Sequence, residues 1–223
     1  MQIAILLYDR FTALDAIGPY EVLSRLDRAE VIFAAERPGP VRTDTGMLTI
    51  AADAGFGELA HPDIVLVPGG PGQEAQLDDG PTHEWLRQAD ATTSWTTSVC
   101  TGSLILAAAG LLQGRRATSH WLALDRLAVF GAKPTRERVV IDGKYVTAAG
   151  VSAGIDMALD LSRRIAGTPA AQAIQLMLEY DPRPPLNAGS PGLAPPDLVA
   201  TMRRRSRHTE PVTLSPAPPP PRP

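Results

Sequence analysis

Apolar and polar positions in the first seventy residues follow two patterns, which predict a sheet covered on both faces. Continuous apolar runs at residues 2–7 and 63–67 are typical of buried strands in a parallel sheet, and a further strand is expected at 31–35. Residues 14–26 carry apolar side chains at helical spacing, with Pro19 near the first turn or at a kink. Strand, helix and strand in succession are typical of α/β folds.

The remainder of the chain continues this alternation. Residues 96–99 are mostly β-branched and predict a buried strand, and the small aliphatic residues at 102–109 predict a helix directly after it. The other expected elements are a loop at 37–45, a short strand at 48–51, a helix at 82–91 capped by Thr82, a short strand at 117–119, a helix at 121–130, a hairpin at 139–148, a helix at 155–166, a helix that Thr168 caps and that ends near Tyr180, and a short basic helix at 197–207.

Proline content divides the chain into three parts. Residues 1–180 are expected to form one α/β domain, and residues 181–208 a proline-rich extension that ends in a short helix packed on that domain. Residues 209–223 contain too little apolar surface to order themselves and are expected to be a disordered tail. Their polyproline run is also compatible with a ligand for a domain that binds polyproline II helices. The basic run at 202–207 is interpreted as a solvated face.

Composition narrows the function classes. The chain has 223 residues and a formal net charge of −3, too small a charge to indicate nucleic acid or an acidic substrate. A single cysteine excludes an intramolecular disulfide and argues against a cysteine-ligated zinc site. The sequence shows neither a signal peptide nor an apolar stretch long enough to cross a bilayer, so we expect no membrane association and a cytoplasmic location.

The single cysteine, Cys100, is placed where the strand at 96–99 turns into the helix at 102–109. At such a joint, called a nucleophile elbow, the side chain projects from the sheet over unpaired N–H groups at the start of the helix. Those N–H groups favour a thiolate and are expected to lower the thiol pKa. The alternative is a small buried apolar residue, which is the common role of a lone cysteine. Its position at the joint, with Gly102 just behind it, favours catalysis.

Gly69 and Gly70 follow the strand at 63–67 within the sequence PGGPG. Glycine permits a turn in which backbone N–H groups point into a shared space. Such a turn is either a tight connection or one half of an oxyanion hole that faces Cys100. A cysteine elbow on the next long strand favours the second interpretation.

Two further residues are candidates on chemical grounds. Asp15 stands at or just before a helix N-terminus, where a carboxylate is either a cap or an acid–base group. His120 follows the strand at 117–119 and is either a base for Cys100 or a hydrogen-bonded histidine packed behind the site. Position in the sequence does not decide between these roles.

Five segments together resemble the DJ-1/PfpI superfamily, and within it the isonitrile hydratases. They are LDAIGPYEVL, DIVLVPGGPG, TTSVCTGSLILAAAGLLQGRRATSHW, AAGVSAGIDMALDL and QLMLEYDPRPPLNAGSP. The resemblance covers residues 1 to about 205. It implies a flavodoxin-like α/β sandwich with a mainly parallel sheet, usually a homodimer, here with residues 20–26 as a contact face, and an enzyme that needs no metal and no organic cofactor.

The resemblance also implies a mechanism, a hydro-lyase reaction that adds water to R–N≡C. Cys100 is then the nucleophile that forms a thioimidate, and Asp15, which stands where many members of the superfamily carry Glu, is the acid–base group. Thr101 is expected to hydrogen-bond Asp15 or the substrate, and the Gly70 N–H to steady developing charge. Many proteases and glutaminases of the superfamily carry His at the position of Thr101, so its absence here argues against those activities.

Three alternatives remain. Regulators of the AraC type share the elbow motif and would make this chain a ligand sensor, but the sequence lacks the paired helix-turn-helix units of such regulators. A redox sensor of the DJ-1 kind would oxidise Cys100 to a sulfinate. A glyoxalase-like enzyme acting on methylglyoxal is the third alternative, and it ranks lower because no histidine adjoins Cys100.

Overall fold

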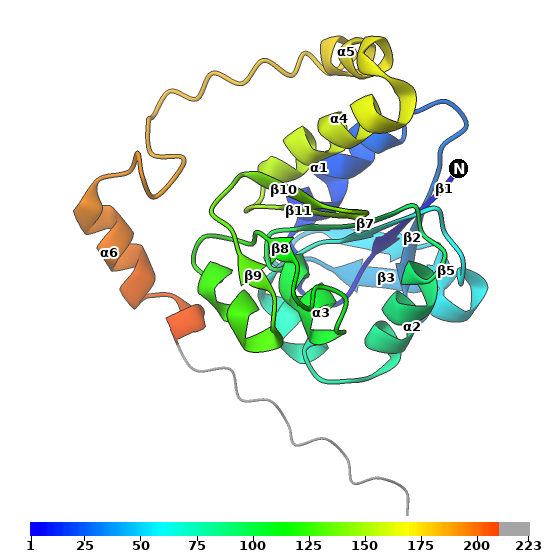
Figure 1. Cartoon of the computed structure of the whole chain (residues 1–223), viewed down its shortest axis with the longest axis horizontal. Helices are drawn as coiled ribbons and strands as arrows, with labels where there is room; N and C mark the ends of the chain where they lie inside the picture. The colour runs from blue at the N-terminus through cyan, green and yellow to red at the C-terminus, as the bar shows by residue number, and fades with distance from the viewer. Residues whose placement is uncertain (210–223) are drawn as a thin grey trace, which may run out of the picture.

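The structure, a computed structural model, describes residues 1–209. In this part of the chain a central sheet carries helices on both faces (Figure 1). The strands of the sheet are β1 (Gln2–Leu6), β2 (Glu30–Ala35), β5 (Ala54–Gly55), β6 (Ile64–Val67), β7 (Trp95–Val99), β10 (Val139–Asp142) and β11 (Tyr145–Ala148). Their spatial order is β10-β11-β7-β6-β1-β2-β5, and all neighbours are parallel except β10 and β11.

The order β2-β1-β6-β7-β11 is that of a flavodoxin-like sheet, in which the chain leaves the first strand in one direction and later returns to its other side. Every residue of β6 and four of the five residues of β1 are buried, as expected for strands that are covered on both faces. The predicted α/β fold with a mainly parallel sheet is therefore confirmed. The hairpin expected at 139–148 is also present, as β10 and β11.

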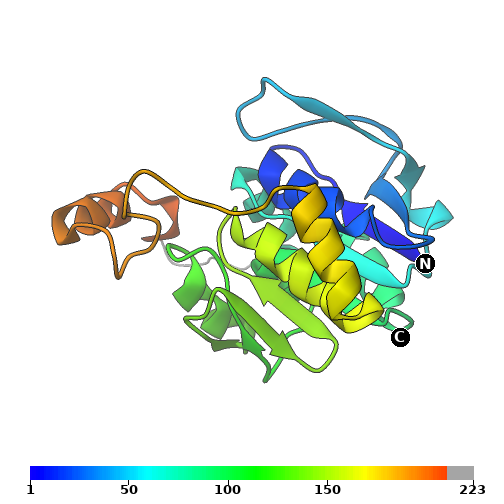
Figure 2. The same cartoon turned by 90° about the horizontal axis from the view of Figure 1, so that it is seen from above.

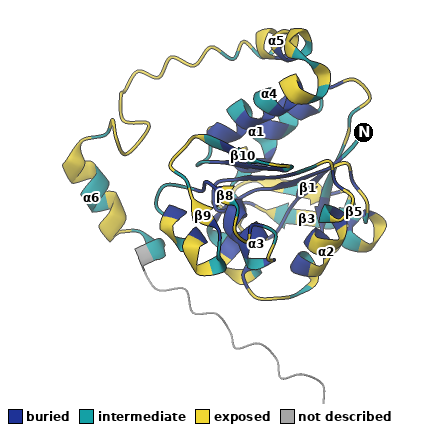
Figure 3. Cartoon of the chain, viewed as in Figure 1, coloured by how far each residue is buried: buried dark blue, intermediate teal, exposed yellow. Residues whose placement is uncertain are grey.

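Two layers of helices enclose the sheet. One face carries α1 (Ala13–Leu23), α4 (Ala153–Ala166) and α5 (Thr168–Met177), and the other carries α2 (Pro81–Asp90), α3 (Gly102–Ala108) and the 3-10 helix η3 (Leu124–Phe130) (Figure 1). Figure 3 shows that burial is concentrated in the strands and in the helix faces that contact them. Pro19 lies in the middle of α1, where Gly154 on α4 packs against its ring.

Several local predictions need correction. The loop expected at 37–45 contains β3 (Gly39–Arg42), which pairs with β4 (Thr49–Ala52) in an antiparallel hairpin. Gly80 rather than Thr82 is the cap of α2, because the Thr82 hydroxyl donates a hydrogen bond to Gln76 instead of bonding the helix start. Gly167 caps α5, and Thr168 is its first helical residue. The remaining short elements are η1 (Phe56–Glu58), η2 (Pro71–Gln76), β8 (Arg116–Ala117), β9 (Lys133–Pro134) and η4 (Arg207–Thr209).

The C-terminal extension leaves the body of the protein after α5. Residues 181–193 are all exposed, and they lead to α6 (Pro196–Arg204), a helix without a buried residue that stands apart from the sheet and its helices (Figures 1 and 2). In the last turn of α6 the Arg203 guanidinium lies 5.8 Å from the centre of the Trp121 ring, and after α6 the chain continues toward η3 (Figure 1).

The expected tail at 209–223 lies outside the described residues, apart from Thr209. Within residues 1–209, no helix combines the length and apolar character needed to span a membrane.

Candidate active site

Three neighbouring strands end at one edge of the sheet and bring the candidate residues together. β6 is paired in parallel with both β1 and β7, so the carboxyl ends of all three strands lie side by side. Cys100 follows β7, the glycine turn follows β6, and the segment that leads to Asp15 follows β1. This edge, where the sheet changes winding direction, is where α/β proteins generally bind ligands.

Cys100 occupies the predicted joint between β7 and α3. Its backbone φ of 58° is the left-handed value that a sharp strand-to-helix turn requires. Its N–H donates to the carbonyl of Ala148 at 3.0 Å, and its carbonyl accepts hydrogen bonds from the hydroxyls of Ser103 and Ser119 at 3.1 and 3.0 Å. These bonds offset the cost of the strained backbone. A Cβ at Gly102 would collide with the carbonyl oxygen of Val67, which explains the glycine behind the thiol.

The thiol pKa differs from the expectation. Burial raises the pKa of Cys100 well above its ordinary value, the charge of Asp15 raises it further, and the backbone N–H groups of Thr101 and Val151 act in the lowering direction. The N–H groups at the helix start thus lower the thiol pKa as predicted, but burial raises it by more, because Cys100 is only 6% exposed. In the free protein the sulfur therefore carries a proton, and it needs a nearby base to become a nucleophile.

Asp15 is an ionisable group that interacts with the thiol. It is fully buried in the first turn of α1, and its Oδ2 accepts a hydrogen bond from the Gly69 N–H at 2.9 Å. Its Oδ1 is also buried and has no hydrogen-bond partner within residues 1–209. Burial raises the pKa of Asp15 to about 7, while the Gly69 N–H and the Cys100 thiol act in the lowering direction. The carboxyl group does not cap α1, because Thr12 precedes that helix and Asp15 bonds a different loop.

The glycine turn is clamped by hydrogen bonds on both sides of two consecutive peptide groups. The peptide between Pro68 and Gly69 accepts from the Tyr8 hydroxyl at 2.9 Å and donates to Asp15. The next peptide accepts from the Thr12 N–H at 2.8 Å, and its own N–H, that of Gly70, donates to Thr101 Oγ1 at 3.0 Å. The turn therefore ties the start of α1 to the start of α3.

This clamp corrects the expected roles of the turn. We expected the N–H groups of Gly69 and Gly70 to face substrate, but they already have protein acceptors. We also expected Thr101 to hydrogen-bond Asp15 or the substrate, and its hydroxyl instead bonds Gly70. The N–H groups that reach the sulfur are those of Thr101 and Val151. The glycines are still required sterically, because a Cβ at Gly69 would lie 2.7 Å from Thr101 Oγ1 and 2.9 Å from Cys100 Cβ.

Sequence reasoning missed Tyr8. Its side chain is 6% exposed, and burial followed by the charge of Asp15 raises its pKa well above the ordinary value, so the hydroxyl keeps its proton and remains a donor to Pro68. A signal was available in the sequence, because Tyr8 lies two residues after the end of β1, at the same sheet edge as the other candidates.

His120 lines the same cavity as Cys100 without a hydrogen bond to it among the described residues. Its Nδ1 accepts from the N–H of Leu122 at 3.3 Å, and its ring packs against Gly150. Burial, with a contribution from Arg207, lowers the pKa of His120, so the ring is neutral near pH 7. This geometry agrees with a histidine packed beside the site.

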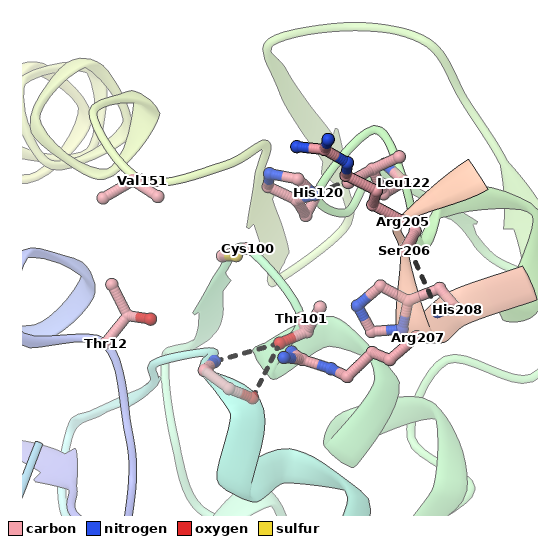
Figure 4. A pocket seen from close by; sticks show the side chains of 11 residues that line it. Thr12, Cys100, Thr101, His120, Leu122, Val151, Arg205, Ser206, Arg207 and His208 are labelled. Atoms are coloured by element: carbon pink, nitrogen blue, oxygen red, sulfur yellow. Dashed lines mark hydrogen bonds between the residues drawn. The ribbon is translucent and has the colours of Figure 1, made fainter. Parts of the chain in front are cut away.

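A cavity of about 350 Å³ opens over the thiol (Figure 4). Thr12, Thr101 and Val151 surround Cys100, and residues 205–208 of the C-terminal extension form the opposite rim. Sequence reasoning also missed this rim, since it assigned the basic run to solvent. Among residues 1–209, no three His, Cys, Asp or Glu side chains are placed to hold a metal ion.

Comparison with known proteins agrees with this geometry. The sequence profile of the DJ-1/PfpI family matches residues 1–164. The chain belongs to the DJ-1/PfpI family. An isonitrile hydratase of Pseudomonas putida is 43% identical over 92% of this chain and 90% of that protein. A crystal structure of a ThiJ/PfpI family protein from Pseudomonas syringae is 42% identical, covers 91% of this chain and 84% of its own, and superimposes with a TM-score of 0.88.

Another protein of similar sequence carries a different name. The HTH-type transcriptional regulator CdhR of Pseudomonas aeruginosa is 33% identical over 88% of this chain, which spans only 61% of the regulator. Proteins similar in sequence to this chain therefore include a transcriptional regulator as well as an enzyme.

Proposed function

We propose that this protein is an isonitrile hydratase, which converts R–N≡C and water into the formamide R–NH–CHO. The observation that carries the proposal is the 43% identity to the isonitrile hydratase of Pseudomonas putida over nearly the full length of both chains. The site supports the same chemistry, because it places a protonated thiol beside a buried carboxyl group whose pKa is about 7. A group with that pKa both gives and takes protons near neutrality.

The first half of the reaction forms a covalent intermediate. The ionised Asp15 accepts the thiol proton as the sulfur of Cys100 adds to the terminal carbon of the isonitrile. Asp15 then delivers that proton to the same carbon, and the product is the thioimidate R–N=CH–S–Cys100. Attack and protonation occur at a single carbon, so a single acid–base group suffices. The N–H groups of Thr101 and Val151, which reach the sulfur, stabilise it while it carries charge.

The second half releases the product. Asp15 takes a proton from water as the water oxygen adds to the thioimidate carbon, and it then delivers that proton to the nitrogen to give R–NH–CH(OH)–S–Cys100. The carbon–sulfur bond then breaks, and Asp15 transfers the hydroxyl proton to the departing sulfur, which restores the thiol. The sum is one isonitrile and one water consumed and one formamide formed. The scheme requires neither a metal ion nor an organic cofactor.

Thr101, Gly69 and Gly70 have positioning roles in this scheme. Gly69 holds the carboxyl group through its N–H, and Thr101 holds Gly70, so that the acid–base group and the nucleophile keep a fixed separation. His120 contributes to the cavity wall without taking part in proton transfer. We also propose that the protein is a homodimer, by its resemblance to the family, with residues 20–26 as a contact face.

The deciding test is formamide production from cyclohexyl isocyanide by the wild-type protein and by the Cys100→Ala variant. We expect wild type to yield the N-substituted formamide. In the variant, the rate of formamide production should be lower by at least about a thousandfold, as for other covalent nucleophiles. Formamide from a folded Cys100→Ala protein at the wild-type rate would refute the covalent scheme. No formamide from either protein would refute the hydratase assignment.

A redox sensor is the weaker candidate. Sensor cysteines are exposed thiolates of low pKa, whereas Cys100 is buried and its pKa is raised. Stoichiometric sulfinate after mild peroxide, without formamide production, would favour the sensor over the hydratase.

A further inference from the structure

The rim of the cavity is the part of the site to which the scheme above assigns no role. It consists of residues 205–208, which come after α6 and lie opposite Cys100 (Figure 4). Two of these four residues are arginines. Of the described residues that line the cavity, none carries a carboxylate. The cavity is therefore cationic at its mouth, although the whole chain carries a formal charge of −3.

The segment is anchored at its end by His208. The His208 side chain is 5% exposed, and its Nδ1 accepts a hydrogen bond from Arg126 at 2.9 Å. Arg126 also holds Glu74 through both terminal nitrogens, with one of the two bonds at 3.0 Å. Burial first, and then the neighbouring arginine charges, lower the pKa of His208 to about 4. The imidazole is therefore neutral near pH 7, as its role as an acceptor requires.

This anchor fixes the position of the adjacent Arg207. The Arg207 side chain extends from the rim into the cavity in the direction of Thr101 (Figure 4). Among residues 1–209 its guanidinium group makes no ion pair and no hydrogen bond. Burial raises the pKa of Tyr8 and lowers that of His120, and the charge of Arg207 acts on both in the lowering direction. The charge is thus felt at the wall of the cavity.

Other cations near the site do not share this property. Arg126 is paired with Glu74, and Arg205 extends toward His120 rather than toward the thiol (Figure 4). An unpaired guanidinium group that faces a cavity attracts an anion, and its planar fork matches the two oxygens of a carboxylate. Leu122 and Val151 supply apolar surface for the carbon chain of a ligand.

We propose that Arg207 determines substrate specificity by pairing with a carboxylate, so that the preferred substrates are isonitriles that carry a carboxylate on the R group. This inference rests on the proposed hydratase function and names its substrate class. The isonitrile carbon meets Cys100 at the floor of the cavity while the carboxylate meets Arg207 at the rim. The binding energy is then available at a distance from the reacting carbon, where it orients the substrate.

The test compares an isocyanobutanoate with the matching isocyanobutanamide, which has nearly the same shape but no charge. The readout is the ratio of kcat/KM for the acid to kcat/KM for the amide. We expect wild type to favour the acid, and Arg207→Gln to reduce the ratio by roughly tenfold to a hundredfold, the range for a charge-assisted pair. Arg207→Lys is expected to retain part of the preference. Rising salt is expected to reduce the ratio in wild type.

The matched control is Arg204→Gln, since Arg204 is an exposed arginine of α6 that contacts Thr201 and does not line the cavity. We expect this variant to keep the wild-type ratio. Equal ratios in wild type and Arg207→Gln would overturn the inference, as would equal losses in both variants. Turnover of cyclohexyl isocyanide by wild type tests the hydratase function separately, so that failure of one proposal is distinguishable from failure of the other.

Discussion

The floor and the rim of the cavity are held in place by different kinds of contact. At the floor, Asp15, Gly69 and Thr101 are fixed by hydrogen bonds among buried groups at the ends of three central strands. At the rim, residues 205–208 are held mainly by His208 on the Arg126–Glu74 ion pair. The connection from the body of the protein to this rim is exposed over residues 181–193.

This difference between floor and rim matches two requirements of an enzyme, proton transfer and substrate recognition. Proton transfer at the floor requires fixed distances and a pKa near neutrality, which a buried, fully clamped carboxyl group supplies. Recognition at the rim requires a charge that is accessible to ligands, which a partly exposed segment supplies. Changes at the floor should therefore affect rate and stability together, whereas changes at the rim should affect recognition.

The largest effect is expected for Asp15→Asn. The amide oxygen can still accept from the Gly69 N–H, so the fold should persist, but proton transfer is lost. We expect kcat to fall by about 10²–10⁴, the usual contribution of a general acid–base group. Steady-state formamide production measures it, with Asp27→Asn as a control because the Asp27 side chain is 94% exposed. Wild-type kinetics in Asp15→Asn would assign this carboxyl group a structural role only.

The next prediction concerns how the stability of wild type and of Asp15→Asn depends on pH. The pKa of Asp15 is raised to about 7 in the folded protein, so between about pH 4 and pH 7 the folded state binds more protons than the unfolded state. The free energy of unfolding of the wild-type protein must then decrease as pH rises through that range. Asp15→Asn should lack this component, and urea unfolding of both proteins at several pH values measures the difference. Parallel pH profiles would show that the carboxyl pKa is not raised.

A smaller effect on stability is expected for Gly69→Ala. The added Cβ would overlap Thr101 Oγ1 and Cys100 Cβ, so the glycine turn must shift. We expect a loss of about 1–3 kcal/mol in the free energy of unfolding, together with reduced kcat. Gly57→Ala is the matched control, because a Cβ there meets nothing within 4 Å. Equal unfolding midpoints in urea for the two variants would mean that the clamp tolerates displacement.

The smallest effect is expected at the rim. His208→Ala removes the anchor but leaves the Arg126–Glu74 pair intact. We expect a severalfold rise in KM, little change in kcat, and a change of at most about 0.5 kcal/mol in the free energy of unfolding. Steady-state kinetics on one isonitrile separates KM from kcat. A loss of kcat as large as that of Asp15→Asn would remove the distinction between floor and rim.

Local patterns were sufficient to predict most of the fold. β1 and β6 are mostly apolar runs, β7 is rich in β-branched residues, and the small residues after Cys100 predicted the elbow. The placement of Asp15 beside the thiol was predicted from resemblance, since its position in the sequence is equally compatible with a helix cap.

What the sequence did not predict depends on tertiary contacts. The pKa of Cys100 is raised because burial outweighs the helix start, and burial is a property of the assembled core. The acceptors of the Gly69 and Gly70 N–H groups come from distant segments, so no local rule identifies them. The basic run at 202–207 was assigned to solvent because nothing in its composition shows that the chain turns back over the cavity after α6.

The exposed connection at 181–193 also bears on how this site diversifies. Because these residues are not part of the core, the sequence after them can vary in length and charge without disturbing the strands that carry the catalytic pair. If both proposals hold, reaction chemistry and ligand choice are encoded in separate stretches of the chain, and an exchange of C-terminal segments between relatives would transfer substrate preference while the reaction stays the same.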